Sequence, residues 1–153
     1  MATNRYKRAR SKREAGSFVS LPHNVIRSQN FVSLSAHAVK LLIDLLSQYK
    51  GNNNGDLCAT WTLMQRRGWK SKDTLNKALK ELRLRDWLET TRQGGRHKPT
   101  LYAVTFIAID SCGGKLDVLA TASPRGSWKK NEPLPPMPNL NTVPRLSGQL
   151  AND

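Results

Sequence analysis

The chain has 153 residues, and its 25 Lys and Arg against 11 Asp and Glu give a formal net charge of +14. No apolar run approaches the roughly 18 residues of a membrane-spanning helix, the basic N-terminus lacks the apolar stretch of a secretory signal, and two cysteines are too few for a disulfide scaffold or a usual zinc site. We therefore expect one domain with tails in a reducing cytoplasm, no membrane partner, and a polyanionic partner, most often nucleic acid.

Residues 1–17 are predicted to form a disordered basic arm, because their charged residues show no apolar periodicity. Residues 1–30 carry +6 of the net charge, residues 31–110 carry +6 and residues 111–153 carry +2. We favour an arm that contacts phosphates over a merely solubilising tail, since the domain that follows is basic as well. The candidate residues of the arm are Arg5, Lys7, Arg8, Arg10, Lys12 and Arg13.

Residues 18–118 are predicted to form the folded domain, which begins with a short extended piece over residues 18–22. A helix is expected over residues 35–50, with Ser35 as its N-cap and Gly51 after its end. A glycine- and asparagine-rich loop and a short apolar strand at residues 57–59 should follow. The apolar face predicted for the helix repeats at i, i+3, i+4 and i+7 and consists of Val39, Leu42, Ile43 and Leu46.

A short helix, a tight turn and a longer helix are predicted next. Thr60 is expected to cap a helix over residues 61–67, Gly68 stands where a left-handed residue closes such a helix, and Trp69 should pack back on its last turn. Ser71 is expected to cap the longer helix. The stripe predicted to be buried consists of Leu75, Ala78, Leu79 and Leu82, and the opposite face holds Asp73, Asn76, Lys77 and Lys80.

A β-hairpin is predicted from two strand-like runs, residues 87–92 and 101–109, the second of which is rich in β-branched and aromatic residues. The turn between them, residues 93–99, contains paired glycines and three basic or potentially basic side chains, so the hairpin should have a charged tip. The large aromatic residues are expected in the core or its seams rather than as base-stacking platforms. They are Trp61, Trp69, Trp87 and Tyr102.

Residues 119–153 are predicted to form a proline-rich, mostly disordered tail, because proline at this density prevents helices and sheet ladders. Residues 133–138 could dock in the groove of a protein partner, although an unstructured tail is the more frequent meaning of such a composition. Trp128 either folds back on the domain or anchors a partner, and both alternatives stay open.

The order helix, short strand, short helix, tight turn, helix and hairpin resembles the winged helix-turn-helix family of DNA-binding domains, over residues 31–110 or so. The segments that carry the resemblance are "RRGWKSKDTLNKALKEL" and "TRQGGRHKPTLYAVTF". The wider stretch is similar to helix-turn-helix proteins of bacterial phages, plasmids and integrative elements. The fold expected is therefore α+β, a three-helix core with a hairpin wing. One departure is Asp86, where related domains often have a glycine before the first wing strand.

The resemblance implies a role for each exposed polar residue of these segments. The third helix would enter the major groove, where Asn76 is the best candidate for a base contact because a carboxamide pairs bidentately with adenine. Residues around the turn would hold the DNA backbone, and the wing tip would touch a minor groove or flanking phosphates. Besides the arm, the candidate residues are Arg66, Arg67, Lys70, Ser71, Lys72, Asp73, Asn76, Lys77, Lys80, Arg92, Arg96, His97 and Lys98.

No catalytic constellation is visible, since the three histidines are isolated and the carboxylates are scattered over different elements. We expect no enzyme and no cofactor or metal. The expected function is sequence-specific binding of double-stranded DNA at the nucleoid, as a transcriptional regulator or a replication-initiation factor of a mobile element. A homodimer is compatible with this function, since helix-turn-helix proteins often bind paired half-sites. The alternatives are a protein–protein interaction module that uses the winged-helix surface or the tail, and RNA binding through basic arms.

Overall fold

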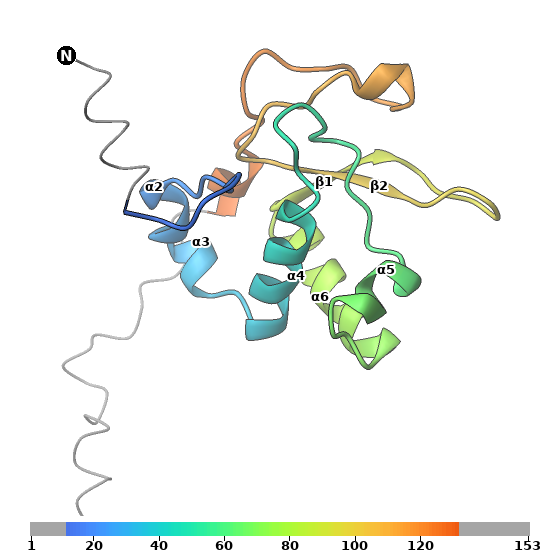
Figure 1. The fold of residues 1–153 in the computed structure, drawn as a ribbon, viewed down its shortest axis with the longest axis horizontal. Coiled ribbons are helices and arrows are strands. Elements are labelled where there is room, and N and C mark those ends of the chain that lie inside the picture. The colour runs from blue at the N-terminus through green and yellow to red at the C-terminus, as the bar shows by residue number, and fades with distance from the viewer. Residues whose placement is uncertain (1–11, 132–153) are drawn as a thin grey trace, which may run out of the picture.

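The computed structural model describes residues 12–131, which form a mixed α+β structure of helices and a two-stranded antiparallel hairpin (Figure 1). α4 packs against α6, and the hairpin follows α6 and extends beyond the helices. No helix within residues 12–131 has the length and apolar character needed to cross a membrane. The elements are α2 (His23–Ile26), α3 (Gln29–Val32), α4 (Ala36–Leu46), α5 (Trp61–Arg66), α6 (Lys72–Leu84), β1 (Leu88–Arg92), β2 (Leu101–Val104), and the 3-10 helices η1 (Cys112–Gly114) and η2 (Ser127–Asn131).

α4 is the first of the predicted helices, and its N-cap is confirmed, because the Ser35 hydroxyl accepts a hydrogen bond from the Ala38 N–H at 3.2 Å. The predicted end was wrong, and the predicted apolar face is confirmed in part, since Leu42 and Leu46 are buried and Val39 packs half-buried against the core. The helix stops at Leu46, and Ile43 is 41% exposed. The i, i+3, i+4, i+7 spacing was correct but begins one residue earlier, since the side chains that reach the core are Ala38, Leu41, Leu42 and Leu45, followed by Leu46.

α2 and α3 were not predicted, although residues 18–22 lack regular structure as expected. Each helix has four residues, which is too short for a periodic pattern to stand out. Local caps define them instead: Pro22 precedes α2, and the Ser28 hydroxyl accepts from the Phe31 N–H at 3.1 Å to start α3.

The hairpin pairs Leu88 with Val104 and Thr90 with Tyr102, and the register shifts by one residue between Thr90 and Arg92. The second strand was predicted to reach residue 109 but ends at Val104. The physical reason is the buried side chain of Asn54, whose amide nitrogen donates to the carbonyls of Val104, Ile107 and Ala108 at 2.8–3.1 Å. These bonds wrap the chain around Asn54 instead of extending it along β1. The predicted short strand before α5 is a single bridge between Leu57 and Tyr102.

Trp128 lies in the core, so the folded part extends beyond the predicted boundary at residue 118. Its ring is 5% exposed and stacks on Trp87, with centroids 5.4 Å apart and planes 6° from parallel. Buried Asn30 joins the two segments, since its amide donates to the carbonyl of Trp128 at 2.9 Å and its oxygen accepts from the Trp87 indole N–H at 3.1 Å. Of the two alternatives for Trp128, folding back on the domain is confirmed. The rest of the predicted tail, residues 132–153, lies outside the described residues.

Candidate nucleic-acid interface

The turn between α5 and α6 is built by a Schellman ending. Gly68 has a φ of +90°, the N–H of Trp69 donates to the carbonyl of Met64 at 3.1 Å, and the N–H of Gly68 donates to that of Gln65 at 3.0 Å. The predicted left-handed glycine and the return of Trp69 onto α5 are confirmed. Thr60 occupies the N-cap position of α5, but its side chain makes no capping hydrogen bond, contrary to expectation.

A buried carboxylate fastens this turn to α4. Asp44, which is 4% exposed, accepts from the Trp69 indole N–H at 2.7 Å, from the Lys40 ammonium at 2.8 Å and from Nε of Arg67 at 3.0 Å. Burial raises the pKa of Asp44, but the hydrogen bonds from Lys40, Trp69 and Arg67 outweigh burial and hold that pKa below its ordinary value. Arg67 was predicted to contact the DNA backbone, whereas its guanidinium here is paired with Asp44 and positions the turn.

The N-terminus of α6 is open to the outside. The Ser71 hydroxyl caps it by accepting from the Thr74 N–H at 3.2 Å, as predicted, and the N–H groups of Lys72 and Asp73 have no acceptor within residues 12–131. Unsatisfied N–H groups at a helix start favour an anion. The Lys72 ammonium lies 5.9 Å from the centroid of the half-buried Trp61 ring.

The exposed face of α6 carries the predicted polar residues. Asn76 and Lys80 are exposed, whereas Lys77 forms an ion pair of 2.9 Å with Asp73. The hydrogen bond and charge of Asp73 raise the pKa of Lys77. The exposed cations of the turn and helix that form no ion pair within the described part of the chain are Arg66, Lys70, Lys72, Lys80 and Arg83.

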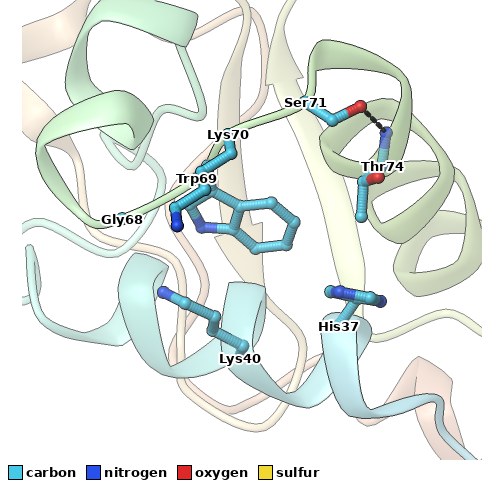
Figure 2. Close-up of a pocket in the computed structure, with 7 residues that line it drawn as sticks. All are labelled: His37, Lys40, Gly68, Trp69, Lys70, Ser71 and Thr74. Atoms are coloured by element: carbon cyan, nitrogen blue, oxygen red, sulfur yellow. Dashed lines mark hydrogen bonds between the residues drawn. The ribbon is translucent and has the colours of Figure 1, made fainter.

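A groove of about 240 Å³ lies between α4 and the start of α6 (Figure 2). Trp69 lies in the middle of the lining residues, His37 of α4 faces Thr74 of α6, and the Lys40 ammonium lies 5.3 Å from the centroid of the Trp69 ring. The sequence reasoning missed the contributions of His37, Lys40 and Thr74. No local signal could have found the first two, because the groove exists only once α4 packs against the turn.

The hairpin tip gathers three of the four predicted wing residues. Gly95 and Lys98 pair across the tip, with the Gly95 N–H donating to the Lys98 carbonyl at 2.9 Å, so Arg96 and His97 form the outermost turn. Arg96, His97 and Lys98 are all exposed. Arg92 lies farther back and is half-buried; its guanidinium donates to the carbonyl of Pro99 at 3.2 Å.

The predicted arm is described only from Lys12 onward, and Arg5, Lys7, Arg8 and Arg10 lie outside the described residues. Lys12 and Arg13 are exposed, and the Arg13 guanidinium lies 4.0 Å from the centroid of the Phe18 ring. The described chain starts on the side of α2 and α3, away from α5, α6 and the hairpin tip (Figure 1). The structure therefore brings the turn, α6 and the tip to one side of the molecule, and does not place Lys12 and Arg13 there.

Comparison of the chain with protein-family models, with curated proteins and with solved structures finds no match. Within residues 12–131, no group of His, Cys, Asp and Glu side chains is arranged to hold a metal ion. This surface offers exposed cations, hydrogen-bond donors and, on α6, the exposed carboxamide of Asn76.

Proposed function

We propose that the protein binds double-stranded DNA in a sequence-specific manner as a winged helix. The observation that carries this proposal is the run of exposed cations from the turn, through α6, to the hairpin tip, most of which form no ion pair among residues 12–131. An unpaired cation is stabilised by a polyanion, and release of the condensed counterions of DNA favours such binding. A helix that presents a carboxamide among these cations also suits the width of the major groove.

α6 enters the major groove with its N-terminal half nearest the bases. Asn76 reads a base edge, and Lys72 and Lys80 flank it. The open N-terminus of α6 and the groove beside Lys40 and Lys70 hold a backbone phosphate. The tip residues Arg96, His97 and Lys98 contact the adjacent minor groove or its phosphates.

The exposed carboxylate of Asp73 serves specificity in this arrangement. It neutralises Lys77 and repels phosphate, so the first turn of α6 gains less from non-specific backbone contact. The carboxamide of Asn76 is then the group on this face whose binding energy depends most on the base that it meets.

The test is binding to selected and random duplexes at several salt concentrations. We expect micromolar or tighter binding to random DNA at moderate salt and a log–log salt slope near about −5 to −7, as about five to eight phosphate contacts would give. Asn76→Ala should weaken binding to the selected sequence by about 1–3 kcal/mol and leave random binding unchanged. The matched variant Lys70→Ala should weaken both alike. Absence of any binding to random duplexes at micromolar protein would overturn the proposal.

The biological role that fits this module is regulation of transcription or initiation of replication for a mobile element, in the bacterial cytoplasm at the nucleoid. Both roles use the same DNA-reading surface. Selection of binding sites from random duplexes addresses the assembly at the same time, since a recovered palindrome indicates a homodimer and a single half-site indicates a monomer.

A further inference from the structure

A second groove lies between the C-terminal half of α6 and the first strand of the hairpin. Its volume is about 410 Å³. Lys80, Arg83 and Leu84 of α6 form one wall, and Leu88 and Thr90 of β1 form the other. Arg83 was not among the predicted contact residues, although it lies three residues after Lys80 and seven after Asn76, which places the three on one face of the helix.

The two walls of this groove are held at a defined angle. α6 ends in a Schellman motif in which Asp86 has a φ of +59°, and the N–H of Trp87 donates to the carbonyl of Leu82 at 2.9 Å. Trp87 is fully buried, so the chain leaves α6 and enters β1 through a fixed corner. A groove between such elements is preformed, and a ligand does not have to order it.

Charge and apolar surface coexist along the groove. Lys80 and Arg83 are exposed and form no ion pair within residues 12–131. Arg83 lines the groove together with Leu88 and Thr90 of the hairpin. Leu84 is 70% exposed at the same edge. Two unpaired cations beside one apolar side chain complement a sugar–phosphate chain, which alternates anionic phosphates with apolar sugar faces.

We propose that this groove holds the backbone of one DNA strand between the part read by α6 and the part touched by the hairpin tip. Lys80 and Arg83 bind successive phosphates, the Thr90 hydroxyl donates to a phosphate oxygen, and Leu84 packs on the intervening sugar. The inference rests on the proposed DNA binding and adds the path of the strand. It makes Arg83 a non-specific anchor that sets how far α6 enters the major groove.

The experiment measures binding to random duplexes from low to moderate salt for the unmodified protein and for Arg83→Gln, Arg83→Lys and Leu84→Asp. Lys50→Gln is the matched control, because Lys50 is exposed, forms no ion pair with another described residue and lines a different groove beside residues 17–19. We expect Arg83→Gln to reduce the magnitude of the log–log salt slope by about 0.9, Arg83→Lys to keep the slope, and Lys50→Gln to change nothing. Leu84→Asp should weaken binding to all sequences by about tenfold, a loss near 1.4 kcal/mol.

The outcomes separate the two proposals. If the unmodified protein binds no duplex, the proposed function fails. If it binds but Arg83→Gln and Leu84→Asp behave like Lys50→Gln, the DNA-binding function stands and the strand path through this groove is wrong. Circular dichroism melting of each variant checks folding, and Arg83→Lys, which retains the charge, keeps the comparison informative if Arg83→Gln is less stable.

Discussion

Replacement of the buried carboxylate Asp44 by asparagine should loosen the turn that leads into α6. Asp44 accepts three hydrogen bonds, from Lys40, Arg67 and Trp69, and all three donors meet on its two oxygens. Asparagine keeps one acceptor oxygen and turns an N–H₂ group toward donors. Lys40 and Arg67 are each 44% exposed, so water can hydrate them after the change. We therefore expect a loss of about 2–3 kcal/mol, below the roughly 3–5 kcal/mol for a fully buried broken pair.

The stability that Asp44 contributes should depend on pH. The pKa of Asp44 is lower in the folded protein than in an unfolded chain. Its contribution to stability is therefore complete above the unfolded pKa of about 4 and is lost as the pH falls through the folded pKa. The difference in unfolding free energy between the unmodified protein and Asp44→Asn should stay roughly constant between about pH 6 and 8 and should shrink below about pH 4.

Urea unfolding followed by circular dichroism measures this difference at each pH. Asp56→Asn is the matched control, since Asp56 forms a single ion pair with Lys115 near the surface and its loss should cost about 0–1 kcal/mol. A loss for Asp44→Asn no larger than that of the control, or a difference that does not change at acid pH, would contradict the role assigned to this carboxylate.

Three further variants test the core, the hairpin and the face of α6. Trp128→Ala should destabilise the protein by about 3–5 kcal/mol in urea unfolding, and a loss under about 1 kcal/mol would show that this segment is dispensable to the core. Gly94→Ala should lower the unfolding free energy by about 1–3 kcal/mol through overpacking, because a Cβ there would lie 2.5 Å from the backbone nitrogen of Thr100 across the hairpin. Gly95→Ala should be neutral in the same measurement, because a Cβ there would meet no atom within 4 Å. Asp73→Asn should strengthen binding to random duplexes several-fold at low salt by removing a charge that repels phosphate, with Lys77 still protonated at neutral pH; unchanged or weaker binding would refute this.

Local signals predicted the parts of the fold that depend on local geometry. Ser35 and Ser71 are N-caps because their hydroxyls reach the N–H groups three residues on, and Gly68 is left-handed because its position in a Schellman ending requires it. The buried stripe of α6 at Leu75, Ala78 and Leu82 follows from helical spacing alone. Asp86 adopts the left-handed conformation that its position demands, in spite of its side chain.

The features that sequence reasoning missed depend on contacts between distant residues. The phase of α4 was shifted because both its polar face and its core face contain apolar residues, and only packing shows that Ile43 is outside. Asn54 ends β2 through hydrogen bonds to carbonyls fifty or more positions along the chain, and Asn30 binds the carbonyl of Trp128, which is 98 positions away. In the candidate interface, most of the predicted cations within residues 12–131 are exposed, but Arg92 is half-buried, and the sequence could not show that Arg67 is paired with Asp44.

The hydrogen bond between Asn30 and the carbonyl of Trp128 spans 98 positions, and it has a consequence for the order of folding during synthesis. α4, α5, α6 and the hairpin are linked by contacts that can form while the ribosome is still translating. α3 and the base of the hairpin, by contrast, cannot complete their packing until η2 has emerged. We therefore expect a nascent chain in which α6 is ordered while α3 still lacks its contact with Trp128, which makes the last folding step a slow, long-range closure.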